Sequence, residues 1–378
     1  MFDLSPDEVQ SAVVETLQEF AAEEIRPFAR DAEKAGEPPE AVLKHLVDMG
    51  FHASVPEEYG GAGEFSSVTK ALIAEQLAWG DPGIAACVLW SSQPAILIGM
   101  AGSEEQRAEW LPIFASGEFI KGSVLLYEHP PLSSGARLAT TARRYGRDWI
   151  LDGHKCGVLW PRGADVRVVV AGIEGSDRLG AFLLPKDSKV DVTRDDSIEG
   201  KIGLRAAPTG QVALRRVIVK GDAFLGGNAA DSGRLERALC ACRIDTGAIA
   251  VGLARAALEY ASNYATERVA FGKPIGAFQG ISFMIADMAT AVDGARLAVW
   301  AAASEIDKGG APTRAVALAN SAALDTALLC GTDSVQVLGG HGFITDHPVE
   351  KWYRDAIALD AFEGALDARA YLAESYAD

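Results

Sequence analysis

Two long helical patterns that meet at a short corner constrain the fold of this chain most. Apolar residues recur at helical spacing over 238–266 and again over 281–300. Between them, Phe271-Gly272-Lys273-Pro274 and Gly276 interrupt the pattern. Long helices joined by such short connections pack antiparallel in a bundle. We therefore expect a C-terminal four-helix bundle, with helices over about 230–266, 279–307 and 312–337.

The middle of the chain consists of short apolar segments instead. Runs rich in Val, Ile and Leu are separated by Gly, Pro, Asp and Ser, as at 166–171 and 211–219. Such segments are typical of strands, and their spacing predicts a small antiparallel barrel. Helical spacing fills the first part, where Ser103-Glu104-Glu105-Gln106 has the form of a capping box. The predicted fold is mixed and mainly α, with an N-terminal helical domain at 1–118, a middle antiparallel β-barrel at 119–228 and the C-terminal four-helix bundle at 229–378.

The composition excludes several classes of function. The formal net charge is -17 and no run of Lys or Arg interrupts it, so nucleic acid and anionic membrane surfaces are excluded as partners. The cysteines are scattered without metal-ligand spacing, which favours reduced thiols and no metal site. The start of the chain lacks the features of a secretory signal, and no apolar run reaches the roughly 20 residues of a membrane span. We expect a soluble, cytoplasmic protein.

The corner between the two long helices carries residues suited to a ligand. Arg268 offers a guanidinium that can bind a pyrophosphate bidentately. Phe271 and Phe278 offer flat rings, and Gln279 offers an amide. Such a set can hold an anion and a heterocycle together. The alternative is an ordinary turn between helices, in which Arg268 forms a surface ion pair with Glu267 or another neighbour.

Two stretches of the chain resemble a known family. Residues 267–288 are similar, nearly residue for residue, to the flavin-contacting corner of the acyl-CoA dehydrogenase family, and 336–355 resemble its other signature. The resemblance implies the three-part fold of that family. It also implies that the corner contacts the FAD of a neighbouring subunit through Arg268, Phe271, Phe278 and Gln279. The adenine end of that FAD would be held by Gln336, Val337, Leu338, Gly339 and Gly340.

The same resemblance implies a catalytic carboxylate near the C-terminus. In the family, a glutamate in a Tyr-Glu-Gly-Thr sequence removes the α-proton of an acyl-CoA, and Phe362-Glu363-Gly364-Ala365 takes that place here. Apolar neighbours raise the pKa of a carboxylate toward neutrality, which suits a general base. The Gly364 amide would help to polarise the thioester oxygen of the substrate. The alternative for Glu363 is a surface carboxylate at a helix start, the usual position of a glutamate.

A second base position occurs in part of the family, on the first bundle helix beside the arginine that is Arg243 here. Cys242 occupies that position in this chain, so no rival base opposes Glu363. Arg243 itself either contacts the CoA moiety or forms a salt bridge on the face of its helix.

The resemblance weakens around the flavin ring. Where the family has Leu-Thr-Glu-Pro this chain carries Tyr127 in place of Thr, and where the family has Trp-Ile-Thr it carries Gly157-Val158-Leu159. A hydroxyl donor and a flat wall are thus missing. One explanation is a divergent pocket in which Tyr127 or Trp160 contacts the ring. Another is a subunit of a mixed oligomer that lends the adenine clamp while its partner holds the working ring.

We predict an FAD-dependent oxidoreductase that converts an acyl-CoA thioester to its 2,3-enoyl form by hydride transfer to flavin. An electron-transfer flavoprotein is the expected electron acceptor. The expected assembly is a homo- or heterotetramer, formed with copies of the chain or with a paralogous subunit. The main alternative is a catalytically weak or silent partner subunit of a heteromeric acyl-CoA dehydrogenase. A flavin oxygenase or nitroalkane-oxidase-like relative is a third reading, and Glu363 speaks against it because such relatives often lack a glutamate there.

Overall fold

The first part of the protein is helical. The structure, a computed structural model, describes residues 6–128, 138–184, 186, 188, 190–195, 200–227 and 230–362. The N-terminal helices are α1 (Glu8–Phe20), α2 (Ala29–Ala35), α3 (Glu40–Asp48), α4 (Ser67–Gly80), α5 (Pro82–Ala101) and α6 (Glu104–Trp110). At the start of α6, Gln106 N–H donates to Ser103 Oγ at 3.3 Å and Ser103 N–H donates to Gln106 Oε1 at 2.9 Å. The predicted capping box is therefore confirmed.

Helix α5 forms the core of this first part. Its sequence is apolar on all sides, and most side chains along it are buried. Asp81 caps its start, because the Ile84 N–H donates to Asp81 Oδ1 at 2.9 Å. By length and mean composition alone, α5 and the segment Thr313–Phe343 would be able to cross a membrane. In α5, however, 89% of that stretch is buried inside the protein, and a core helix passes the same test.

A seven-stranded sheet follows the helices. Its strands are β1 (Gly122–Leu125), β2 (Thr141–Tyr145), β3 (Asp148–Leu159), β4 (Val166–Ile173), β5 (Leu179–Leu184), β6 (Asp191–Asp195) and β7 (Thr209–Val219). They lie in the order β1-β4-β2-β3-β7-β6, and β5 pairs with β4. Strands β1 and β2 run parallel to β4, and the remaining pairs are antiparallel. The sheet is therefore mixed, where the sequence had indicated purely antiparallel pairing.

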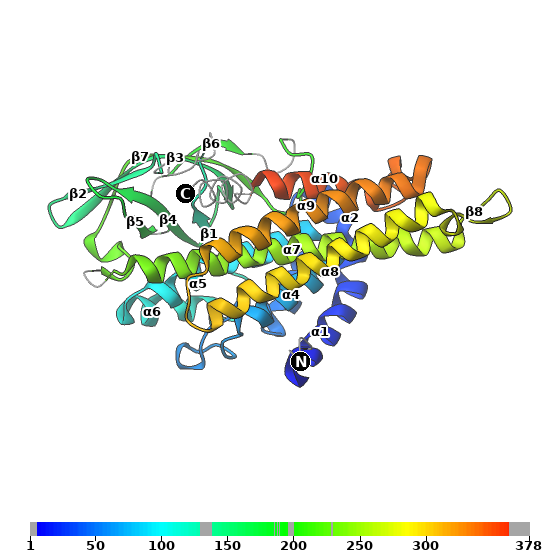
Figure 1. Cartoon of the computed structure of the whole chain (residues 1–378). Helices are drawn as coiled ribbons and strands as arrows, with labels where there is room; N and C mark the ends of the chain where they lie inside the picture. Colours follow the sequence, from blue (N-terminus) through cyan, green and yellow to red (C-terminus); the bar gives the residue numbers. More distant parts are fainter. Residues whose placement is uncertain are drawn as a thin grey trace, which may run out of the picture.

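The last part is a helix bundle of α7 (Ser232–Glu267), α8 (Gln279–Asp307), α9 (Thr313–Leu338) and α10 (Val349–Phe362). The corner between α7 and α8 is a small hairpin of β8 (Val269–Ala270) and β9 (Lys273–Pro274). Figure 1 shows the long bundle helices side by side, with this hairpin at one end of the molecule and the sheet toward the other. The sequence of helical part, sheet and bundle confirms the predicted fold class.

Helix α7 connects the three parts. It packs against α4 and α5 of the first part as well as against α8 and α9. Gly252 permits the closest approach, since a Cβ there would lie 2.4 Å from the Glu75 carbonyl oxygen of α4. The sheet reaches this pair of helices through β1 on α5 and β5 on α7. The space between the sheet, α5 and α7 is where the functional site lies.

Candidate active site

Two adjoining cavities lie where the sheet meets α5 and α7. The outer cavity has a volume of about 390 Å³ and the inner cavity about 20 Å³. Both are lined by Leu126, Tyr127, Leu239 and Arg243. The outer cavity adds further leucines, among them Leu179. Leucine walls with a guanidinium at the junction suit an elongated, mainly apolar molecule that carries an anionic or carbonyl group.

One wall of the outer cavity is polar. Thr313 Oγ1 donates to Glu236 Oε1 at 2.5 Å and lies 3.7 Å from Cys240 Sγ. Burial raises the pKa of Cys240, so its thiol stays protonated at neutral pH. A protonated thiol is a poor nucleophile and a poor metal ligand. This wall therefore offers hydrogen bonds rather than covalent chemistry.

The inner cavity is lined by side chains of α5 and by backbone and side chains of β3 and α7. Gln93 Nε2 donates to the Cys242 carbonyl at 3.3 Å, which joins α5 to α7 beside the cavity. Trp90 is 4% exposed, and its Nε1–H has no acceptor among the described residues. A buried donor without an acceptor costs free energy. The Trp90 N–H is therefore a candidate contact for a ligand in this cavity.

A bulge in β3 shapes the opposite wall of the inner cavity. The register of β3 against β7 shifts between Lys155 and Val158, and Gly157 has a φ of 61°. Glycine adopts that backbone angle without the strain that a side chain would bring. At the position of the family's tryptophan, the chain thus presents backbone to the cavity, and Leu159 replaces the hydroxyl two residues later.

A buried ion pair holds Tyr127 beside both cavities. Lys155 is fully buried, and its Nζ donates to Glu128 Oε1 at 2.7 Å and to the Leu126 carbonyl at 2.9 Å. The Cys156 N–H donates to the Tyr127 carbonyl at 2.9 Å. Burial lowers the pKa of Lys155 to about 8 in spite of the Glu128 charge. Burial alone would raise the pKa of Glu128, but the charge and hydrogen bond of Lys155 hold it below its ordinary value.

Trp160 does not have the position that the sequence analysis gave it as a contact of the flavin ring. Its side chain is 4% exposed, and its Nε1–H donates to Ser91 Oγ of α5 at 2.8 Å. It is absent from the lining of both cavities. Trp160 thus helps to pack the sheet against α5. Of the two aromatic residues proposed to contact the flavin ring, only Tyr127 lines the site.

The predicted flavin-contacting corner forms a separate site on the hairpin between α7 and α8. Phe271 is 97% exposed, and its ring centroid lies 6.2 Å from that of the half-buried Phe278. Arg268 and Gln279 are exposed on the same corner. Within the described residues the Arg268 guanidinium has neither an ion-pair nor a hydrogen-bond partner. The surface ion pair with Glu267, which the sequence left open, is not formed.

The predicted adenine-binding segment lies at the end of α9 and in the 3₁₀ turn that follows, η8 (Gly339–Phe343). Gln336, Gly339 and Gly340 are exposed. Val337 and Leu338 are 4% and 3% exposed, so their side chains belong to the core of the bundle. His341 Nδ1 lies 2.8 Å from the hydroxyl of Tyr264, four residues before Arg268 on α7. The segment is thereby tied to the end of α7 that carries the corner.

The corner and the cavities are far apart in one chain. Arg243 and Arg268 are 25 residues apart along α7 and its C-cap, which corresponds to about 37 Å at 1.5 Å per residue. Figure 1 shows the same separation between the β8 hairpin and the sheet. The structure therefore brings Arg268, Phe271, Phe278 and Gln279 together, but it does not bring them to Arg243.

The predicted base lies outside the described residues. Helix α10 is described up to Phe362, and Glu363 and Gly364 follow it. Sequence reasoning missed Trp90, Gln93 and Lys155. The first two could have been noticed because α5 is otherwise so apolar that a hydrogen-bonding side chain within it stands out.

Comparison with known proteins assigns the chain to a family. Models of the acyl-CoA dehydrogenase N-terminal and C-terminal domains match residues 7–118 and 233–371. The chain is 34% identical over 357 residues to a probable acyl-CoA dehydrogenase of Mycobacterium leprae, covering 92% of this chain and 90% of that protein.

Solved structures show the same likeness. A glutaryl-CoA dehydrogenase of Mycobacterium smegmatis in complex with FADH2 is similar with a TM-score of 0.84 at 26% identity, covering 97% of this chain and 93% of that chain. A chain solved in work on the electron transferring flavoprotein of Acidaminococcus fermentans and flavin-based electron bifurcation has a TM-score of 0.88 at 30% identity, covering 99% of both chains.

The chain belongs to the acyl-CoA dehydrogenase family, a family of flavoprotein oxidoreductases. It is accordingly an acyl-CoA dehydrogenase, and its general reaction is the dehydrogenation of an acyl-CoA thioester. The predicted family and enzyme class are confirmed.

Proposed function

We propose that this chain, with FAD as cofactor, oxidises the Cα–Cβ bond of an acyl-CoA to give the 2,3-enoyl-CoA. The observation that carries the proposal is the outer cavity, with its leucine walls and Arg243 at the junction with the inner cavity. An acyl chain and a pantetheine arm need an apolar cleft, whereas the thioester and phosphates need polar groups beside it. Arg243 is proposed to contact the CoA portion.

Glu363 is the proposed base. It follows directly on Phe362, the last residue of α10, and its sequence neighbours are apolar. A carboxylate in such surroundings has a raised pKa and can take an α-proton at neutral pH. Proton transfer of this kind contributes roughly 10² to 10⁴-fold to the rate. The Gly364 N–H is proposed to donate to the thioester oxygen and to stabilise its developing negative charge.

The exposed corner fits the pyrophosphate and adenine of FAD. Arg268 offers a guanidinium without a partner among the described residues, Gln279 is exposed on the same corner, and Gln336 is exposed at the end of α9. A Cβ added at Gly339 or Gly340 would meet no atom within 4 Å from the rest of the described residues, so a ligand can approach the backbone there. Because the corner is remote from Arg243, we propose that it holds FAD bound in a neighbouring subunit. Bound FAD would supply the acceptor for the hydride from the β-carbon.

The proposed partners follow from that arrangement. A corner that serves another chain requires an oligomer, either of identical chains or with a paralogous subunit. The likeness to a chain solved in work on an electron transferring flavoprotein supports such a protein as the electron acceptor. The predicted domain boundaries at 118 and 228 and the predicted cytoplasmic location remain predictions.

One observation favours the alternative of a partner subunit with little activity of its own. The inner cavity holds only about 20 Å³, and Gly157 and Leu159 replace the flat wall and the hydroxyl donor of the family. A chain of this kind would lend its exposed corner to a partner whose own cavity holds the working flavin ring.

An absorption spectrum of the purified chain decides between the two readings. The proposed function predicts a flavin band that is bleached by one class in a panel of acyl-CoAs. A colourless protein that turns yellow only with a paralogous partner would support the helper role. A flavin band that no acyl-CoA bleaches, combined with oxygen uptake in the absence of acyl-CoA, would contradict both readings.

A further inference from the structure

A buried charge cluster on α10 contacts all three parts of the molecule. Lys351 Nζ donates to Asp81 Oδ2 and, at 2.7 Å, to Asp355 Oδ2. The three residues are 2%, 0% and 1% exposed. Burial acts to lower the pKa of Lys351, but the charges of Asp355 and Asp81 overcome it and raise the pKa above its ordinary value. Burial also raises the pKa of Asp81, although the charge of Lys351 opposes that shift. The ammonium of Lys351 thus lies between two buried carboxyl groups.

The carboxylate of Asp81 connects Lys351 to α5, which forms one wall of the inner cavity. Asp81 is the N-cap of α5, and its Oδ1 accepts the Ile84 N–H at 2.9 Å. Helix α5 carries Trp90 and Gln93, both of which line the inner cavity. Because the cap fixes the first turn of a helix, the ion pair with Lys351 fixes where this wall begins.

The carboxylate of Asp355 connects α10 to the loop that precedes the sheet wall of the inner cavity. Asp355 Oδ1 accepts the Leu204 N–H at 2.6 Å. The loop at Leu204 runs directly into β7, whose first residues pair with Val158 and Leu159 of β3 at the inner cavity. The loop touches α10 closely, since a Cβ on Gly203 would lie 2.1 Å from the Arg354 carbonyl. Asp355 thus connects the start of this wall to α10, and Lys351 bonds the other oxygen of the same carboxylate.

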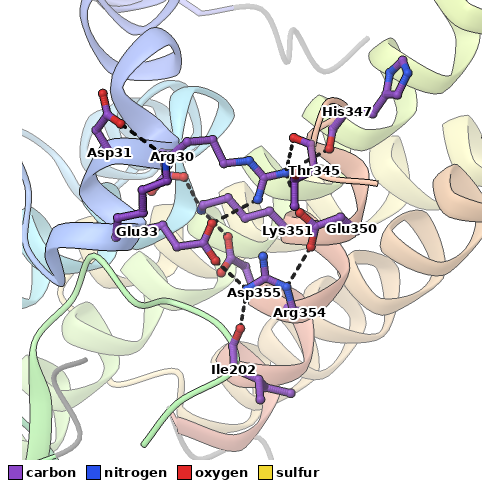
Figure 2. A network of polar contacts seen from close by, with 12 residues as sticks. Arg30, Asp31, Glu33, Ile202, Thr345, His347, Glu350, Lys351, Arg354 and Asp355 are labelled. Carbon is purple, nitrogen blue, oxygen red and sulfur yellow. Dashed lines mark hydrogen bonds and ion pairs between the residues drawn. The ribbon is translucent and has the colours of Figure 1, made fainter. Parts of the chain in front are cut away.

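A second, more exposed cluster already fastens α10 to the rest of the chain. Figure 2 shows Arg354 and Glu350 of α10 facing Arg30 and Glu33 of α2. Arg354 Nη1 donates to Glu33 Oε1 at 2.6 Å, and Arg30 Nη2 lies 2.5 Å from Glu350 Oε1. Attachment of α10 therefore does not require the buried cluster. A buried ion pair is also a poor source of stability, because desolvation offsets most of its attraction.

The geometry points to Lys351 as a positioning residue for the reaction. It sets α10 relative to the α5 wall and the β3 wall of the cavities. This inference rests on the proposed function, in which Glu363 acts as the base. Two carboxylates and one ammonium hold the three elements at fixed distances, whereas apolar packing alone would let them slide.

The test compares Lys351→Met with a matched control, Glu33→Gln, in the oligomer that retains FAD. Glu33→Gln removes the charge that pairs with Arg354 and Arg30 in the second cluster, and it changes no residue of the buried one. Misplacement of reacting groups by about 1 Å can cost about 100-fold in rate. We expect kcat per bound flavin to fall 10- to 100-fold in Lys351→Met, with KM changed less than threefold, and both constants to stay within twofold in Glu33→Gln. A kcat for Lys351→Met within twofold of the unmodified protein overturns the inference.

Hydrogen exchange separates this inference from the proposed function. Lys351 bonds neither the Ile84 nor the Leu204 backbone amide. If it couples the two walls, Lys351→Met should nevertheless raise the hydrogen-exchange rate of both amides more than tenfold above their rates in Glu33→Gln. If the unmodified protein oxidises no acyl-CoA, the proposed function fails while this measurement still decides whether Lys351 couples the walls. Asp355→Asn, which keeps the side-chain shape, replaces Lys351→Met if the latter does not fold. In Asp355→Asn, unchanged exchange at Ile84 contradicts the coupling.

Discussion

Single residues carry the proposed chemistry, and the residues packed around them fix their positions. Arg243 stands at the junction of two cavities, and Tyr127 is held there by a buried ion pair beneath it. Lys155 and Glu128 are absent from the lining of both cavities. Their role is to fix the backbone on which Tyr127 lies, and Glu128 extends that hold to the N–H groups of Ala139 and Thr140 at 2.6 and 3.0 Å.

Replacement of the proposed base tests the mechanism directly. Glu363→Gln keeps the size of the side chain but cannot accept the α-proton, so acyl-CoA should no longer bleach the flavin band while FAD stays bound. Stopped-flow absorbance at the flavin band measures this. Glu305→Gln, which changes an exposed carboxylate on α8, is the control. Unchanged reduction in Glu363→Gln would rule the residue out as base.

The buried pair under Tyr127 predicts a pH dependence of stability. The pKa of Glu128 is below its ordinary value in the folded protein, where Lys155 outweighs the opposing effect of burial. Stability from Glu128 is therefore complete above the ordinary carboxylate pKa and is lost as the pH falls through the folded value. We expect Glu128→Gln to lower the unfolding free energy at pH 7 and to flatten its fall toward acid. Urea unfolding at a series of pH values checks this, and parallel acid limbs for the two proteins would contradict it.

At the scale of elements, α7 determines the plan of the site. One end of the helix lines the cavities. The other end carries the exposed corner, whose Arg268 guanidinium has no partner among the described residues. The corner keeps its shape through local contacts, such as the Ile275 N–H that donates to the Arg268 carbonyl at 2.8 Å. An arginine held in the open by a well-formed hairpin is suited to a ligand that arrives from outside the chain.

Replacement of that arginine should weaken FAD binding without affecting the fold. Charge-assisted hydrogen bonds are worth about 1.5–3 kcal/mol each, so Arg268→Gln should raise the Kd for FAD about 10- to 100-fold. The melting temperature of the FAD-free protein should not change, because the Arg268 guanidinium has no partner in the described chain. Fluorescence titration with FAD measures the affinity. Lys308→Gln on the exposed end of α8 is the control, and equal Kd values for the two variants would remove Arg268 from the proposed clamp.

At the scale of the molecule, the proposed site is divided between the two ends of α7. The proposed FAD clamp lies at one end and the cavity proposed for acyl-CoA at the other, so we expect occupancy of the cofactor to depend on assembly. Exposed apolar side chains on the bundle, among them Phe283 and Phe343 at 62% and 79%, mark surfaces that another chain could cover.

Dilution of the protein should therefore dissociate the oligomer and release FAD over the same range of concentrations. Sedimentation velocity recorded at the flavin band and at 280 nm compares the two directly. We expect flavin absorbance to sediment with the oligomer and to appear as free FAD once protomers separate. A monomer that keeps its flavin at high dilution would show that the corner serves its own chain or no FAD at all.

Local patterns in the chain were enough to predict its helices and their caps. Helices α7, α8 and α9 begin and end within two residues of the expected positions, and Ser103 and Gln106 form the capping box that their spacing indicates. These features depend on hydrogen bonds and side-chain contacts within one turn or along one face, so a short stretch of residues is sufficient to specify them. The two family signatures likewise identified the corner and the class of enzyme.

Long-range packing determined the features that local patterns did not predict. Strand β4 takes β1 and β2 as parallel neighbours, which no strand pattern encodes. Val337 and Leu338 turn into the bundle while Gln336 stays outside, and Trp160 packs on α5 instead of lining a cavity. Asp81 and Lys351 are separated by 270 positions in the chain, yet they form one buried charge cluster. Such contacts depend on how whole elements dock, because burial decides which polar groups must find a partner and which positions become a cavity wall.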